Sequence, residues 1–291
     1  MFIERFVNYL KYEKRLSAHT LISYQTDLAQ FHQFLEKQEL QLTEVNHFHV
    51  RSWVMQLMDA GIEARTVNHK ISTLRSFYKF LLRESVVDKT PMTQIKALKM
   101  PKRLPVVVEE EELSILLDQE DTFTKDFAGL RDRVIIELLF GTGVRLAELL
   151  GLKDSDVEVY EQQIKVLGKR SKERIIPLTK PLLNLLQQYI QQKQSLFPET
   201  HALIVTDKGQ VAYSNFVYRL VKEVLSKIST QDKKSPHVLR HTFATSLLNK
   251  GADLNAIKEL LGHANLSATQ IYTHNSVERL KSVYKQAHPK A

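Results

Sequence analysis

Residues 98–105, with the sequence LKMPKRLP, separate two parts of the chain that differ in hydrophobic pattern. The stretch has two prolines, three cations and little apolar periodicity, which is typical of an extended linker. A surface loop can have the same composition, but the position between two complete patterns favours a domain boundary. The sequence therefore predicts a first domain at residues 1–97, a linker at 98–105 and a second domain at 106–291.

The first part of the chain has the apolar spacing of helices. Phe2, Phe6 and Leu10 indicate a helix at the start. Ser17 fits the N-cap position of a second helix at residues 18–37, and further helices are predicted at about 48–58 and 64–84. Four helices with short joins predict a small helical bundle.

The second part mixes helices with a few strands. Helices are predicted near residues 109–117, 127–140, 180–194 and 213–228, followed by several short ones. Residues 163–167 and 174–178 flank the turn GKRSKE and predict a β-hairpin that bends at Gly168. The expected fold is mainly α with a small β-sheet.

Composition and charge limit the classes of protein to which the chain can belong. The net charge is +8, and residues 1–105 hold 16 Lys and Arg against 10 Asp and Glu, which indicates a polyanion partner although mildly basic chains are common. No apolar run approaches the roughly 20 residues that cross a membrane, and the first 15 residues lack the pattern of a secretory signal. The absence of cysteine excludes disulfides and thiolate sites and fits a cytoplasmic location.

Residues 141–152, GTGVRLAELLGL, place an arginine after a predicted helix break. Gly141 and Gly143 are expected to end the preceding helix, and Arg145 to open a short new one. An arginine at a buried junction requires an anion. Glu148, one helical turn later, can supply it, and this pairing is the favoured interpretation of Arg145 taken alone. No nucleotide-binding glycine motif is complete here.

Residues 235–251, SPHVLRHTFATSLLNKG, give the strongest local signal. Ser235 and Pro236 fit the start of a helix whose first turn carries His237 and Arg240. A helix N-terminus attracts phosphate, and an arginine fork matches two phosphate oxygens. His237 and His241 also have metal-ligand spacing, but no HExxH glutamate or thiolate accompanies them, so neither a metal nor a cofactor is expected.

The hairpin turn and the C-terminal region supply the remaining candidates. Lys169 and Lys172 lie in the turn, where an ammonium can protonate an alkoxide leaving group, although a solvated charged turn is more common. His263 follows Gly262, and a capping box after it places Tyr272 in a short helix. A phenol with a pKa of about 10 attacks at neutral pH only with help, which neighbouring cations provide.

Five ordered blocks resemble the tyrosine recombinases, also called the phage-integrase family, and are most similar to the Xer type. They are GTGVRLAELLGL, GKRSKERIIPL, HVLRHTFATSLL with ELLGHANLSATQIYTH, and upstream LSAHTLISYQTDLAQF and RTVNHKISTLRSFYKFLL. The resemblance covers almost the whole chain. It implies a two-domain, C-shaped DNA clamp, with a four-helix SAM-like core-binding domain and an α+β catalytic domain.

The resemblance also implies the role of each candidate. Tyr272 would attack a DNA phosphate to give a 3′-phosphotyrosyl link. The other implied catalytic residues are Arg145 and Arg240 on the scissile phosphate, Lys169 as acid to the leaving 5′-oxygen, His237 for the tyrosine proton and His263 as a phosphate donor, with Glu148 behind Arg145. Family members often have glycine after the hairpin lysine, where this chain has Arg170, so Lys172 is an alternative to Lys169.

The implied partner is a double-stranded DNA recombination site, bound by a homo- or hetero-tetramer on two sites without ATP or metal. Residues expected by position to contact DNA are His19, Thr20, Arg65, Asn68, Lys70, Arg75, Lys102, Arg170 and Lys172. A C-terminal helix at 277–286, with Leu280, Val283 and Tyr284, is expected to dock on a neighbouring protomer. Because the core-binding pattern begins at residue 2, no further N-terminal DNA-binding domain is expected.

The biological role has alternatives. A Xer-type enzyme would resolve chromosome dimers during segregation and cell division, prompted by a septal DNA translocase, whereas an integrase or transposase would move its own element with the same chemistry. A DNA-binding protein without catalysis, a type IB topoisomerase-like enzyme and a metallohydrolase using His237, His241 and His263 are the competing classes.

Overall fold

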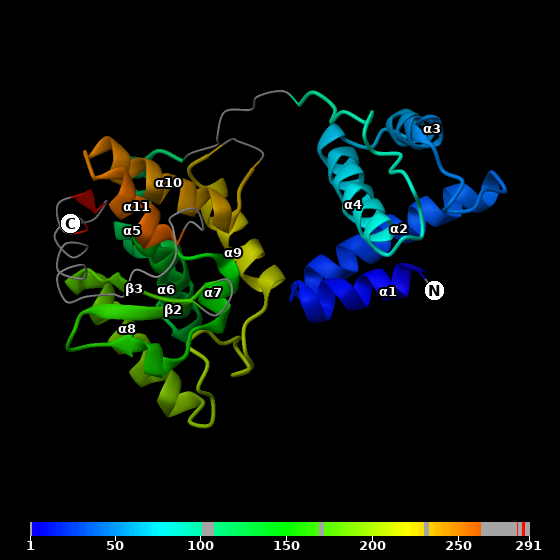
Figure 1. Cartoon of the computed structure of the whole chain (residues 1–291). Helices are drawn as coiled ribbons and strands as arrows, with labels where there is room; N and C mark the ends of the chain where they lie inside the picture. Colours follow the sequence, from blue (N-terminus) through cyan, green and yellow to red (C-terminus); the bar gives the residue numbers. More distant parts are fainter. Residues whose placement is uncertain are drawn as a thin grey trace. The chain divides into compact units, whose positions relative to one another are not determined.

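The computed structural model describes residues 2–100, 108–168, 172–229 and 233–262, together with Tyr284, Ala287 and His288. The chain divides into two compact units, Met1–Arg103 and Leu104–Ala291. Each unit has its own apolar core, and the named strands belong to the second unit (Figure 1). Most of the predicted linker, residues 101–105, lies outside the described residues. No described helix is both long and apolar enough to cross a bilayer.

The first unit is the predicted helical bundle. It contains α1 (Phe2–Asn8), a π-helical turn η1 (Tyr9–Glu13), α2 (Ala18–Lys37), α3 (His47–Asp59) and α4 (Ala64–Arg83). Ser17 caps α2 as predicted, because its side chain accepts a hydrogen bond from the backbone N–H of Thr20 at 3.3 Å. Aromatic side chains from different helices meet in the core: the ring of Phe6 lies 5.2 Å from that of Phe77, and the ring of Phe31 lies 4.9 Å from that of Trp53.

The second unit is built around α6 (Phe127–Thr142), in which every residue from Val134 to Thr142 is buried. Hydrophobic residues on every side of α6, such as Val134, Ile136 and Phe140, have no exposed surface, which is the pattern of a central helix. The other described elements of this unit are α5 (Glu110–Asp118), η2 (Glu120–Thr122), α7 (Leu146–Gly151), η3 (Asp154–Asp156), α8 (Lys180–Leu196), α9 (Ser214–Ser226), α10 (Pro236–Asn249) and α11 (Leu254–Leu261).

A three-stranded antiparallel sheet lies in the same unit. Its order is β1 (Val157–Glu158), β2 (Gln163–Leu167), β3 (Glu173–Pro177), and Leu167 pairs with Glu173 at the turn end of the hairpin. The N–H of Gly168 donates to the carbonyl of Lys172 at 2.8 Å, which closes the base of the turn. The predicted hairpin is confirmed, with β3 beginning one residue earlier than expected, and β1 is an addition that the sequence pattern did not show.

The end of α6 differs from the prediction in one respect. Gly141 lies inside the helix, so the expectation that both glycines break it is wrong for Gly141. Gly143 alone ends α6, in the left-handed region at φ 61°, where a Cβ atom would lie 2.4 Å from the ring of Phe243. The tight turn at Gly143 brings the chain directly to Arg145, the N-cap residue of α7.

Candidate active site

Arg145 is held at the start of α7 by the glutamate one turn later. The Glu148 side chain accepts from the backbone N–H of Arg145 at 2.8 Å and from Nη1 of the same residue at 2.8 Å. The pairing that the sequence favoured for Arg145 is therefore present. It leaves the Arg145 side chain 31% exposed, so the guanidinium is oriented by Glu148 and still reaches the surface.

Glu148 serves a second arginine, which the sequence analysis did not single out. Arg174 of β3 donates Nη1 to Oε1 and Nη2 to Oε2 of Glu148, both at 2.8 Å. Burial alone raises the pKa of Glu148, but the hydrogen bonds and charge of Arg174, with the bonds from Arg145, outweigh it and lower that pKa from 4.5 to about 2. Glu148 is therefore a carboxylate at every physiological pH.

Three arginines meet the last carbonyls of α11. Arg174 Nε donates to Leu260 at 2.8 Å, Arg240 Nη2 donates to Leu261, and Arg145 Nη2 donates to Gly262 at 3.0 Å. The final carbonyls of a helix have no partner within it and carry partial negative charge, so cations are favourable there. Arg145 and Arg240, the two predicted site arginines, therefore lie together at the C-terminus of α11.

Arg240 differs from the other two arginines because its hydrogen bonds to described residues go to backbone oxygens. Its Nη1 donates to the carbonyl of Gly143 and its Nη2 to that of Leu261. Burial, then repulsion by Arg145 and Arg174, lowers the pKa of Arg240 to about 10, although Glu148 acts in the opposite direction. Arg240 therefore remains a cation at neutral pH, buried to 6% exposure.

The charge balance of this cluster favours an anion. In the described part of the chain, three guanidiniums lie near one carboxylate, that of Glu148, which binds Arg145 and Arg174 and whose charge also acts on Arg240. A partly buried site with this excess of positive charge is suited to a phosphate, which arginine forks match in geometry. Such a site can also stabilise negative charge that develops on a phosphorus atom.

His237 lies in the first turn of α10, three residues before Arg240, and is exposed. Its ring centroid is 4.3 Å from that of His241 in an edge-on arrangement. Ser235 occupies the N-cap position of α10 without a side-chain capping bond, and Pro236 is the first helical residue, as predicted. Among the described residues no group of three His, Asp or Glu side chains is arranged to hold a metal ion.

Of the residues predicted for the second unit's site, Lys169, Arg170, His263 and Tyr272 lie outside the described residues. Two of them directly follow described glycines, Gly168 at the base of the hairpin and Gly262 at the end of α11. Lys172, the alternative hairpin lysine, is exposed. The roles proposed from the sequence for these residues stay predictions.

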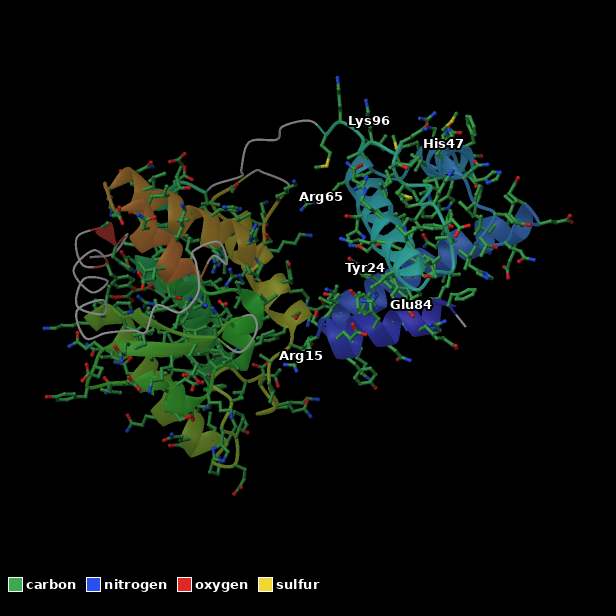
Figure 2. All side chains as sticks on the ribbon, viewed as in Figure 1. Arg15, Tyr24, His47, Arg65, Glu84 and Lys96 are labelled. Atoms are coloured by element: carbon green, nitrogen blue, oxygen red, sulfur yellow. The ribbon has the colours of Figure 1, made fainter. Side chains whose placement is uncertain are left out.

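Some of the residues expected to contact DNA in the first unit are exposed, and others are engaged in contacts within the unit. His19 and Arg65 are exposed, and Figure 2 shows Arg65 on the outside of this unit together with Lys96. Asn68 and Arg75 instead hold the segment that follows α4: Asn68 exchanges hydrogen bonds with the backbone of Leu98 at 2.7 and 3.0 Å, and Arg75 donates to the carbonyl of Ile95 at 3.0 Å. Thr20 bonds to Ser17, and Lys102 lies outside the described residues.

Lys70 requires a correction. It is 4% exposed, and its ammonium binds Asp27 at 2.8 Å and Gln30 at 2.6 Å. Asp27 also accepts from Thr73 at 2.8 Å, so this buried polar cluster joins α2 to α4. Lys70 therefore has a structural role and is not available to a phosphate, because removing it would leave the Asp27 carboxylate buried and short of a partner.

The C-terminal residue Tyr284 packs within its own chain. Its hydroxyl donates to the carbonyl of Gly141 at 2.7 Å, and the His288 ring lies at 2.8 Å from the same oxygen. Tyr284 is 1% exposed. The side chain is therefore buried, as expected, but it is buried against α6 of its own chain. Leu280 and Val283 lie outside the described residues, and docking on a neighbouring protomer stays a prediction.

The lowered pKa of Glu148 predicts a change in acid stability. A carboxyl group whose folded pKa is below its unfolded value stabilises the fold above the unfolded value, and this contribution is lost as pH falls through the folded one. We expect the difference in stability between wild type and Glu148→Gln to be largest above pH 5 and to shrink by about 3 kcal/mol towards pH 2. Urea unfolding at several pH values measures this, and a difference that does not depend on pH would contradict it.

Comparisons with known proteins agree with this architecture. Residues 107–279 match the phage integrase family, and residues 3–85 match the N-terminal SAM-like domain of phage integrases. The chain is 40% identical over 297 residues to the tyrosine recombinase XerC of Listeria innocua, covering 99% of this chain and 97% of that protein. It is 41% identical over 293 residues to the XerC of Staphylococcus aureus, covering 99% and 96%.

Solved structures show the same fold. A XerH site-specific recombinase bound to its palindromic difH substrate superposes with a TM-score of 0.74 at 23% identity, covering 96% of this chain and 82% of that one. XerA recombinase is 28% identical with a TM-score of 0.51, covering 98% and 97%. The chain therefore belongs to the phage integrase family and is an enzyme of the tyrosine recombinase class, which catalyses site-specific recombination of DNA.

Proposed function

We propose that this enzyme cuts and rejoins DNA through a 3′-phosphotyrosyl intermediate formed by Tyr272. The observation that carries this proposal is the excess of guanidinium over carboxylate at the end of α11, where Arg145 and Arg240 lie next to the position at which His263 enters the chain. The family to which the chain belongs supports the choice of a tyrosine nucleophile. Residues 98–105 would be the linker that lets the two units close on DNA.

Each step conserves atoms and charge. The Tyr272 oxygen bonds to phosphorus as its proton passes to His237, and the bond from phosphorus to the 5′-oxygen breaks while Lys169, or Lys172, protonates that oxygen. Arg145, Arg240 and His263 neutralise the charge on the non-bridging oxygens. Rejoining reverses the step with a 5′-hydroxyl of the partner strand, so the energy of the phosphodiester is kept in the tyrosyl ester and ATP is not required.

The substrate we propose is a pair of recombination sites in chromosomal DNA, in the cytoplasm. Resolution of chromosome dimers is favoured over movement of a mobile element because the relatives named XerC match this chain over almost its full length. We propose a homo- or hetero-tetramer in which the C-terminal segment docks on a neighbour and a septal DNA translocase starts the reaction. In that assembly Tyr284 and His288 would release the carbonyl of Gly141 on their own chain.

Trapping the covalent intermediate tests this function. Purified protein is incubated with nicked duplexes made from the source chromosome, in which the cleaved 5′-end diffuses away and rejoining fails. We expect a protein–DNA adduct that survives denaturation, forms equally in the presence of a chelator, and maps to one sequence when the attached DNA is sequenced. DNA binding without any adduct would overturn the proposal in favour of a non-catalytic DNA-binding role. Adducts spread evenly over the chromosome would instead indicate a relaxing enzyme.

A further inference from the structure

Arg174 is a buried arginine whose bonds are all made inside the protein. It lies in β3 at 4% exposure, with Nε bound to the carbonyl of Leu260 and both Nη atoms bound to Glu148. Each of its three nitrogens thus has a partner at 2.8 Å. A guanidinium that is buried and fully engaged in this way does not reach a DNA phosphate.

The place of Arg174 is nevertheless central to the candidate site. A Cβ atom on Gly168 would lie 3.6 Å from Nη1 of Arg174, and one on Gly262 would lie 3.2 Å from its Cδ. The residues that follow these two glycines are Lys169 and His263. Arg174 therefore packs against the base of the hairpin and against the end of α11, two backbone positions from which proposed site residues depart.

Arg174 also governs the orientation of Arg145 through a shared carboxylate. Oε1 of Glu148 accepts from Nη1 of both arginines, and Oε2 accepts from the Arg145 backbone N–H and from Nη2 of Arg174. The second contact of the Arg145 guanidinium is the carbonyl of Gly262, two residues after the carbonyl that Arg174 holds. Both groups that orient Arg145 are thus fixed by Arg174.

We propose that Arg174 is a positioning residue for strand cleavage: it sets the orientation of Arg145 and the path of the chain into His263 without touching DNA. This inference rests on the proposed function, because it assigns Arg145 to the scissile phosphate. Misplacing a reacting group by about 1 Å can cost roughly 10²-fold in rate. Loss of Arg174 accordingly lowers the rate of the chemical step more than the affinity for DNA.

The test substitutes Arg174→Lys, which keeps the charge and removes the fork. One ammonium cannot reproduce the paired bonds to Glu148 together with the bond to Leu260. We expect adduct formation at saturating enzyme to slow by about 10²-fold, with a dissociation constant for the same duplex within about threefold of wild type. Single-turnover trapping and a band-shift titration measure the two quantities separately.

Arg131→Lys is the matched control. Arg131 is also buried, at 3% exposure, and pairs with Asp132 and Asp207. It lies near the start of α6, roughly 18 Å along the helix from the turn that leads to Arg145. We expect this variant to lose thermal stability to a degree similar to Arg174→Lys while its cleavage rate stays near that of wild type. Equal slowing in both variants would mean that the rate reflects general loosening, and the proposal would fail.

A double-mutant cycle with Glu148→Gln completes the design. If Arg174 acts through Glu148, adding Arg174→Lys to Glu148→Gln slows cleavage by much less than it slows wild type. Should Arg174→Lys not fold, Glu148→Gln alone decides, since cleavage at the wild-type rate in that variant overturns the proposal. Failure of the proposed function is distinct, because wild type itself would then form no adduct. The present inference is judged by the rates of the variants when wild type does form the adduct, and it fails if Arg174→Lys forms the adduct as fast as wild type.

Discussion

Replacing Tyr272 by phenylalanine is expected to abolish covalent attachment to DNA while leaving DNA binding unchanged. The substitution removes one oxygen and keeps the ring, so packing around position 272 changes little. The chain has ten tyrosines, and the prediction is specific to Tyr272 because it is the tyrosine of the block ELLGHANLSATQIYTH, nine positions after His263. The measurement is adduct formation on the trapped nicked duplex, with band shifts of the same duplex as the binding control.

Tyr284→Phe is the matched control for this prediction. Tyr284 is the second tyrosine of the C-terminal region, and the structure describes it: its hydroxyl donates to the carbonyl of Gly141. Burial raises the pKa of Tyr284 well above the ordinary value, which disfavours the phenolate that an attack requires. We expect Tyr284→Phe to form the adduct. An adduct that persists in Tyr272→Phe and disappears in Tyr284→Phe would show that the nucleophile is assigned to the wrong residue.

The elements predicted well from sequence are those whose signals are local. α2 begins and ends at the predicted residues because Ser17 supplies a cap and the apolar residues repeat along one face. α11 carries the same kind of local signal, since Asp253 accepts from the N–H of Ala256 at 3.1 Å and Gly262 ends the helix at φ 63°. Caps, periodicity and left-handed glycines act within a few residues, so a single sequence reveals them.

The features that sequence did not reveal depend on contacts between distant segments. β1 has two residues and exists only because β2 offers it a partner. Lys70 was expected by its position to contact DNA, yet its ammonium is buried against Asp27 of another helix. Arg174 gave one usable sign: it alternates with Ile176 on the buried face of β3, and a cation at such a position requires a carboxylate.

In the candidate site too, the local contact was predictable from sequence and the long-range contacts were not. The sequence anticipated the pair of Arg145 and Glu148, which are one helical turn apart. It did not anticipate that three successive carbonyls of α11 receive three arginines, because these come from β3, α10 and the start of α7. The excess of positive charge arises because arginines from three different elements lie together, and no single sequence motif reveals it.

Substitution of Arg240 by methionine is expected to slow adduct formation by about 10²- to 10³-fold, the range found when one fixed donor to a developing oxyanion is removed. Arg240 is held in advance by the carbonyls of Gly143 and Leu261, so it needs no rearrangement when charge develops on the phosphate. Single-turnover trapping gives the rate. Arg219→Met is the control of equal charge change, because Arg219 is exposed on α9, where it donates to the hydroxyl of Tyr213 at 3.1 Å.

The melting temperature of Arg240→Met distinguishes a loss of catalysis from damage to the fold. Burial is the chief cause that lowers the pKa of Arg240 from its ordinary value to about 10. Keeping Arg240 charged therefore costs folding free energy at pH below 10, and this cost disappears as pH rises above the pKa of the unfolded chain. Methionine removes that cost and also removes two hydrogen bonds, and the two changes oppose each other. We therefore expect only a small shift in melting temperature beside a large loss of rate. A variant that melts far below wild type, or one that cleaves at more than a tenth of the wild-type rate, would mean that Arg240 serves the fold and not the phosphate.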